Sequence, residues 1–256
     1  MRQAVRPSPI FFAIVAVTAG GGVMAWFATN ERSALAYAGV FVFVLAGWVV
    51  SLCLHEFGHA YTAWRFGDRD VEARGYLTLN PLKYSHPALS IVLPLVFILL
   101  GGIGLPGGAV YVRTSWMTPK QRTIVSLAGP FANAVLAVVL LTLTAVFFDY
   151  DTHHGVFWSG VAFLGLLQIM ALLLNLLPIP GLDGYGALEP HLSYETQRAL
   201  APAKQWGFVI LFVLLFIPPV NFAFFSLVEW VFSLSGVNPR LAGLGLSLTR
   251  FWSAWF

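Results

Sequence analysis

The sequence predicts an all-α polytopic membrane protein, because it is rich in apolar residues, poor in charge and divided into long apolar segments. Of its 256 residues, 58% are hydrophobic and only 10% are charged, and the mean hydropathy is +0.79. This composition excludes an ordinary soluble domain. The net charge is a modest +3 and no basic cluster is present, so the expected surroundings are a lipid bilayer and no nucleic acid. No repeat or polar insertion divides the chain, which predicts one integral membrane domain over residues 1–256.

The first three apolar segments differ in length and therefore in expected structure. Residues 9–29 follow Arg2 and Arg6; this charge order is that of a signal peptide, but the apolar length favours an uncleaved span. Residues 34–66 form a second, long span. Residues 88–105 are short and interrupted by proline and glycine, which predicts a re-entrant or short β-like element covered by protein or lining a cavity.

The remaining segments predict further spans and an apolar tail. Residues 123–148 and 156–177 are long enough to cross a bilayer. Residues 206–234 are apolar but broken by two adjacent prolines, and the tail 241–256 is expected to lie at the membrane interface. We therefore expect about five to six spans in total.

The second segment carries the pattern His55-Glu56-Phe-Gly-His59, a signature of zinc hydrolases. Residues four apart share one helix face, so His55 and His59 can bind one metal ion. Catalytic zinc takes three protein ligands and a water, whose proton a nearby carboxylate such as Glu56 can accept. Such groups are costly within a membrane unless they have partners and a function. The pattern therefore predicts hydrolysis within or beside the bilayer.

Cys53, the only cysteine, lies two residues before His55, so no intrachain disulfide can form. It points to a different helix face from the histidines, which favours packing in the apolar span over a role as third ligand.

The distribution of Lys and Arg predicts the orientation of the segments. Basic residues precede the first segment and populate the loops 65–83 and 111–122, whereas the loop 149–154 has none. The N-terminus and both basic loops are therefore expected in the cytoplasm, and the loop 149–154 outside. This orientation requires residues 88–105 to enter and leave the membrane on the same side.

The same orientation suggests a third metal ligand. Asp183 follows a Pro-Ile-Pro-Gly stretch that ends a helix and turns the chain, and it falls on the same side as His55 and His59. Without the two histidines, an interfacial turn would be the better interpretation of Asp183. The other loop histidines are interpreted as non-ligands: His153, His154 and His191.

Four segments of the chain resemble those of the site-2 protease family of intramembrane zinc metalloproteases. They are His55-Glu-Phe-Gly-His59, the stretch Asn175-Leu-Leu-Pro-Ile-Pro-Gly-Leu-Asp183-Gly184, Gly129-Pro130-Phe-Ala-Asn133, and Leu79-Asn80-Pro81-Leu82-Lys83. The last is similar to a segment of the compact bacterial branch. The resemblance extends from the second apolar segment through Gly184.

The resemblance implies a core of three membrane helices within about residues 34–184, with hydrophobic segments at 206–256 following it. It implies one Zn2+ per chain, with these site residues: His55, His59 and Asp183 as ligands and Glu56 as catalytic base. Asn175 is assigned to the substrate backbone or the oxyanion beside the metal. For Asn133, that role and a helix–helix hydrogen bond are equally open.

The sequence therefore predicts a zinc-dependent intramembrane endopeptidase that cleaves single-span, regulatory membrane proteins. Two alternatives are an inactive relative that binds membrane partners, which the presence of Glu56 disfavours, and a metal transporter, which the single clustered site disfavours. The strand-like stretch 109–113 is predicted to present an edge that pairs with an unwound substrate helix. The expected location is the bacterial inner membrane, with the active site near the cytoplasmic side, and assembly as a homo-oligomer is left open.

Two departures from the family bear on the site. No segment is long or polar enough for the PDZ domain of larger members, and no CBS pair follows the core. His86-Pro87 stands where the compact branch is expected to have Asp-Pro. A gating or inhibitory role for His86 is an open alternative to an interfacial loop histidine, which we favour.

Overall fold

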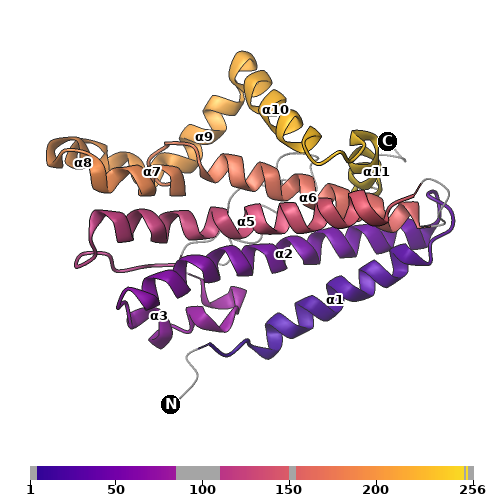
Figure 1. The fold of residues 1–256 in the computed structure, drawn as a ribbon, viewed down its shortest axis with the longest axis horizontal. Coiled ribbons are helices and arrows are strands. Elements are labelled where there is room, and N and C mark those ends of the chain that lie inside the picture. Colours follow the sequence, from indigo (N-terminus) through magenta and orange to yellow (C-terminus); the bar gives the residue numbers. More distant parts are fainter. Residues whose placement is uncertain (1–4, 85–109, 150–153, 251, 253–256) are drawn as a thin grey trace.

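The protein is described here by a computed structural model that covers residues 5–84, 110–149, 154–250 and 252. Four long helices lie side by side in it (Figure 1): α1 (Pro9–Trp26), α2 (Ala34–Arg65), α5 (Pro119–Phe147) and α6 (Gly155–Asn175). Each is long and apolar enough to cross a membrane, and a bent pair at Tyr194–Trp206 and Val209–Leu215 gives a fifth candidate. The described part of the chain contains helices and no strand. The prediction of an all-α polytopic membrane protein is confirmed.

Three of the four long helices begin where a polar side chain accepts a hydrogen bond from a backbone amide that has no acceptor within the helix. Ser8 accepts a hydrogen bond from the amide of Phe11, and Ser33 does the same for Ala36. At the start of α5, Thr118 and Gln121 form a reciprocal capping box. α1, α2 and α5 therefore have a local start signal as well as an apolar interior, whereas α6 follows His154 without a side-chain cap.

Small residues let the helices pack closely. A side chain at Gly21 of α1 would meet the backbone of Phe43 in α2, and one at Gly39 would meet the backbone of Ala25. Farther along α2, a Cβ on Gly58 would lie 2.7 Å from the carbonyl oxygen of Ala128 in α5. Close approach through small residues is the usual way in which membrane helices associate. The face of α2 that carries the histidine motif is thereby pressed against α5.

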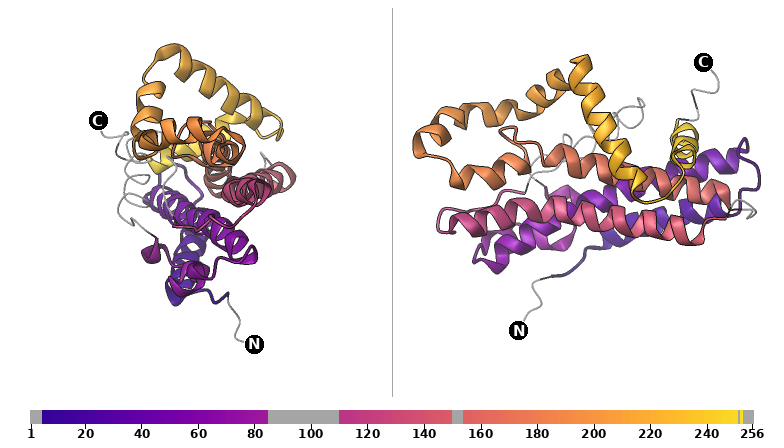
Figure 2. Two further views of the ribbon diagram at one scale, coloured as in Figure 1. Left: turned by 90° about the vertical axis from the view of Figure 1, so that its left-hand side faces the viewer. Right: turned by 45° about the horizontal axis from the view of Figure 1, so that its top comes forward.

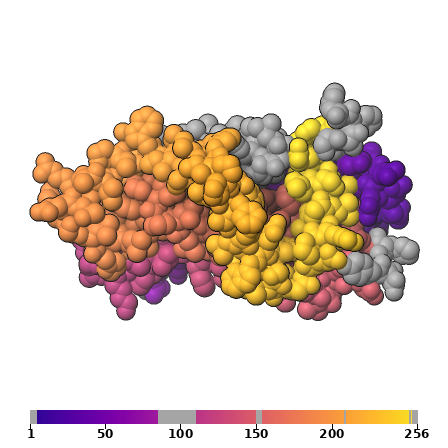
Figure 3. Space-filling model, turned by 90° about the horizontal axis from the view of Figure 1, so that it is seen from above, coloured from indigo at the N-terminus to yellow at the C-terminus, as the bar shows by residue number. Residues whose placement is uncertain are grey.

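Shorter helices follow α2 and α6: α3 (Asp70–Ala73), η1 (Tyr76–Thr78), η2 (Pro81–Lys83), α7 (Asp183–Leu188), η4 (Glu189–His191), α8 (Tyr194–Leu200), η5 (Ala201–Trp206), α9 (Gly207–Leu215), α10 (Pro218–Ser233) and α11 (Pro239–Thr249). The predicted break at Pro218 and Pro219 is confirmed, because α9 ends at Leu215 and α10 starts at Pro218. Seen from above, α10 and α11 lie across the bundle (Figure 3).

The described part of the apolar tail packs directly against the helix bundle. α11 lies across α6 (Figure 2), and a Cβ on its Gly245 would meet the carbonyl oxygen of Ser159. Leu241 and Leu248 of α11 are buried in the same hydrophobic core as α6. The described part of the tail is thus a component of the bundle.

Segments expected on one side of the membrane lie at one end of the bundle (Figure 1). There, the amide of Ser8 donates to the carbonyl of Thr78, and the Trp116 indole donates to the carbonyl of Phe66. At the opposite end, His154 bonds to the carbonyl of Trp26. The two basic loops and Ser8, which precedes α1, therefore share one end. The predicted re-entrant segment 88–105 lies outside the described residues, as do His86 and His153.

Candidate metal centre

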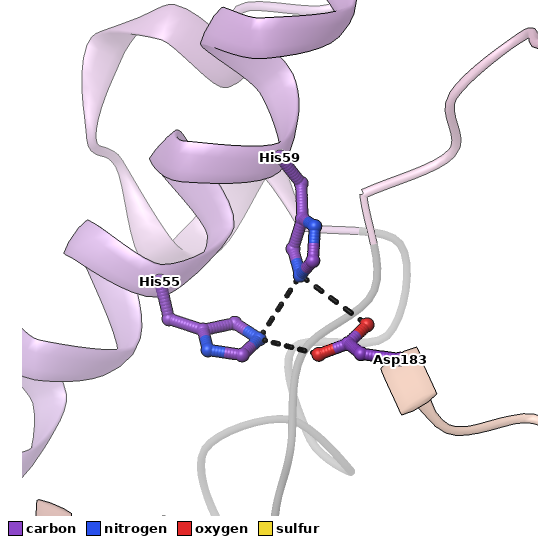
Figure 4. A group of neighbouring side chains, drawn as sticks. All are labelled: His55, His59 and Asp183. Carbon is purple, nitrogen blue, oxygen red and sulfur yellow. Dashed lines mark hydrogen bonds and ion pairs between the residues drawn. The ribbon is translucent and has the colours of Figure 1, made fainter. Parts of the chain in front are cut away.

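His55 and His59 project from the same face of α2 toward the start of α7, where Asp183 is the first helical residue (Figure 4). The two Nε2 atoms are 3.1 Å apart. Asp183 places Oδ2 3.3 Å from His55 Nε2 and Oδ1 3.4 Å from His59 Nε2. Two ligand atoms bound to the same tetrahedral zinc ion lie about 3.3 Å apart. The structure thus brings together the three residues that the sequence singled out, as one group able to hold a metal ion.

Both imidazoles are oriented by hydrogen bonds at the other ring nitrogen. His59 Nδ1 lies 2.8 Å from the carbonyl oxygen of Val125, and His55 Nδ1 lies 2.7 Å from Oδ1 of Asn133. A carbonyl oxygen can only accept, so Nδ1 carries the hydrogen and Nε2 keeps its lone pair for a metal. The ring orientations fit a metal centre.

Asp183 reaches the histidines because the chain turns sharply after α6. The amide of Leu182 donates to the carbonyl of Ile179, and Gly181 adopts a φ of +100° that favours glycine. A Cβ on Gly184 would collide with the carbonyl oxygen of Leu176. The Pro-Ile-Pro-Gly-Leu-Asp-Gly stretch therefore needs its glycines to fold Asp183 back over the end of α6.

The Asp183 carboxyl has the properties of a metal ligand. Its Oδ2 is buried without a hydrogen-bond donor, which is the expected state of an oxygen placed to bind a cation.

Glu56 is 2% exposed and accepts a hydrogen bond from the amide of Val110 at its Oε2 (3.0 Å). Val110 follows the segment 85–109. The described residues 110–113 of the stretch predicted to be strand-like form no strand, and the amide of Arg113 donates to Asp68. A carboxylate next to the metal ligands is thus held in place by the backbone of a distant segment. No sequence pattern indicated this contact.

The two asparagines occupy different positions. Asn175 lines a small cavity together with His55, Trp48 and Asn133. Asn133 uses its oxygen for His55, and its amide nitrogen lies 3.3 Å from Oε1 of Gln168. Gln168 was not singled out from the sequence, although a lone glutamine inside an apolar helix carries the same signal as the asparagines.

The other candidates that the structure describes do not belong to the metal-binding group. His191 bonds to Thr123, and His154 stacks on Trp26 at the far end of the bundle. Cys53 is buried and belongs to no metal-binding group among the described residues. His86 and His153 lie outside the described residues.

The chain is similar to one protein family and to several named proteins. Residues 41–156 match the family model described as Peptidase family M50. The chain is 67% identical to "Putative zinc metalloprotease Rip2" of Mycolicibacterium smegmatis, over 100% of this chain and 98% of that protein. It is 64% identical to the Rip2 of Mycobacterium tuberculosis H37Rv over the same shares, and 33% identical to "Putative zinc metalloprotease YwhC" of Bacillus subtilis over 68% of this chain and 79% of that protein. No solved structure matches the chain significantly.

Proposed function

Because the chain belongs to peptidase family M50, the site-2 protease family that its motifs resemble, we propose that it is a zinc-dependent endopeptidase that cleaves the membrane segments of other proteins. The observation that carries this proposal is the placement of His55, His59 and Asp183 around one point, with Glu56 beside them. The naming of the relatives as zinc metalloproteases supports zinc as the metal.

We assign metal binding, proton transfer and substrate binding to different residues. His55, His59 and Asp183 would hold a zinc ion, which polarises a scissile carbonyl and acidifies a water. Glu56 accepts the proton of that water and passes it to the leaving amine. Since the amide of Val110 engages Oε2, we assign the proton transfer to Oε1. Asn175, in the cavity beside His55, is assigned to the substrate backbone or its oxyanion.

The position of the site along α2 supports cleavage within a membrane. The helix has 32 residues and is about 48 Å long, whereas the hydrocarbon core of a bilayer is about 30 Å thick. His55 and His59 lie in the last third of α2, near the end that carries the basic loops. We infer that the metal lies just inside one membrane face and, from the positive-inside rule, that this is the cytoplasmic face of the cell membrane.

A substrate helix must unwind locally before its peptide bonds become accessible. Residues 110–113 form no strand, but hydrogen bonds hold both ends of this stretch, at Val110 to Glu56 and at Arg113 to Asp68. We assign to this stretch the edge along which an unwound, single-span substrate pairs. The substrate backbone would then run directly past Glu56.

A transport function has less support. A metal pathway needs several groups of ligands along the membrane, whereas the described residues contain a single group of three. A binding role without catalysis is distinguished by co-expressing the protein with single-span membrane proteins of the same cell. The proposal expects one of them to be shortened by the wild type and left intact by Glu56→Gln.

We expect the purified protein to hold about one zinc ion per chain, measured by elemental analysis. His55→Ala, His59→Ala and Asp183→Ala should each lower that content, because each removes one of three ligands. Cys53→Ser is the matched control, since Cys53 is buried in the same helix but outside the group. Full zinc content in Asp183→Ala would refute the assignment of the third ligand.

The proposed orientation predicts which loops are accessible from outside the cell. In a Cys53→Ser background, Arg65→Cys and Ser115→Cys should be protected from a membrane-impermeant thiol reagent on intact cells, and Arg32→Cys should be labelled. All three positions are exposed. Labelling of both basic loops from outside would show that the orientation is the reverse of the one proposed.

A further inference from the structure

A network of buried hydrogen bonds runs from the metal centre into the middle of the bundle. It starts at His55 in α2, passes through Asn133 in α5 and Gln168 in α6, and returns to α2 at Ser51. The four residues are 6%, 3%, 0% and 4% exposed, respectively. Buried polar groups are retained in such places only when they are paired.

The last hydrogen bond of this network, at Ser51, fixes which group donates in each of the others. The Ser51 hydroxyl donates to the carbonyl oxygen of Trp48 (2.7 Å), so its oxygen accepts from Nε2 of Gln168 (3.1 Å). Gln168 therefore turns Oε1 toward Asn133 and accepts from its Nδ2 (3.3 Å). Since its amide hydrogens then point toward Gln168, Asn133 turns its oxygen toward His55 Nδ1.

The direction matters because an asparagine amide can rotate by half a turn. A rotated Asn133 would offer its amino group to His55 Nδ1, which would then accept a hydrogen bond. The hydrogen of the neutral ring would move to Nε2, the atom that faces Asp183 and His59, and would block a metal there. His59 does not face this choice, because its Nδ1 meets the backbone carbonyl of Val125.

We propose that Gln168 and Ser51 are positioning residues that hold the oxygen of Asn133 toward His55 and thereby keep the hydrogen of His55 on Nδ1. The assignment of zinc to the Nε2 lone pair rests on the proposed function. The hydrogen-bond direction itself does not.

The first test is zinc affinity, measured by chelator competition on the detergent-solubilised full chain. Gln168→Met keeps the side-chain length but removes both hydrogen bonds, and it should weaken zinc binding by about tenfold, the lower end of the range for groups behind a ligand. Leu167→Met, one residue away and buried, should leave the affinity unchanged. Equal affinities of Gln168→Met and the wild type would overturn the proposal.

A second variant keeps the test decisive if Gln168→Met does not fold. Ser51→Ala removes the hydroxyl that sets the direction, and should weaken zinc binding, though by less than Gln168→Met because the amide of Gln168 remains. Its matched control is Ser159→Ala. Ser159 is also buried and donates to the carbonyl three residues earlier, but it is not a member of the hydrogen-bond network. An equal effect of the two serine variants would overturn the proposal.

A rescue experiment separates direction from packing. Asn133→Asp cannot present an amino group to His55, so the orientation no longer depends on Gln168. We expect Gln168→Met to change the zinc affinity less than about twofold when it is added to Asn133→Asp. A tenfold loss in that background as well would assign Gln168 a structural role only.

The tautomer of His55 can be read without metal or substrate. In zinc-free protein labelled with 15N-histidine, the wild type should keep hydrogen on Nδ1 of His55, whether or not Nε2, which faces Asp183, is also protonated. Gln168→Met should show a fraction in which Nδ1 is without hydrogen and only Nε2 carries one. This result would stand even if the wild type bound no zinc or cleaved no peptide, so failure of the proposed function is distinguishable. An unchanged tautomer in Gln168→Met would overturn the inference directly.

Discussion

Glu56→Gln is expected to abolish peptide cleavage while leaving zinc bound. Glutamine has the size of glutamate and can still accept the hydrogen bond from the amide of Val110 through its side-chain oxygen. It cannot take the proton of a water, and loss of a general base lowers the rate by about 100- to 10,000-fold. The measurement is cleavage and zinc content in the same preparation, with cleavage scored on a co-expressed single-span substrate.

The matched control is Glu72→Gln, because Glu72 lies beyond the end of α2, where it accepts a hydrogen bond from the Trp64 indole. This variant should retain both zinc and activity. Full activity in Glu56→Gln would point to another base, and loss of zinc would mean that Glu56 is part of the metal centre.

Gly129→Ala should disable the metal centre although Gly129 binds nothing itself. A Cβ at this position would collide with Nε2 of His59 and lie 2.6 Å from Nε2 of His55, which is closer than real side chains approach. Either the rings or α5 must move, and a displacement of about 1 Å lowers activity on the order of 100-fold. Zinc affinity and cleavage should both fall.

The control is Gly20→Ala in α1, where an added Cβ meets no atom within 4 Å. Alanine there should be neutral or slightly stabilising, because it favours helix. If Gly129→Ala binds zinc like the wild type, the close packing of α5 on the histidines is incorrect.

The membrane helices were predictable because their signals are local. The first two apolar segments begin at residues 9 and 34, the positions at which α1 and α2 start. The break before α10 coincides with Pro218 and Pro219, which occupy the first turn of that helix, where proline is favoured. Such features depend on neighbours in the sequence and need no knowledge of the fold.

The site was predictable only in part, because its contacts differ in kind. His55 and His59 follow from helical spacing, and Asp183 follows from loop charge and a turn. The partners of these groups are separated along the chain by long intervals: 78 residues from His55 to Asn133 and 117 from Ser51 to Gln168. The local sequence does not indicate which polar groups will form hydrogen bonds with each other. The bond between Val110 and Glu56 and the network through Gln168 are therefore visible only in the fold.

The position of the cut bond tests the central claim most directly. Wild type and Glu56→Gln are each co-expressed with a panel of single-span membrane proteins, and new chain termini are mapped by mass spectrometry. We predict a Glu56-dependent cut inside the apolar segment of at least one panel member, near its cytoplasmic end. Glu56-dependent cuts confined to soluble domains, or no terminus that depends on Glu56, would contradict cleavage within the membrane.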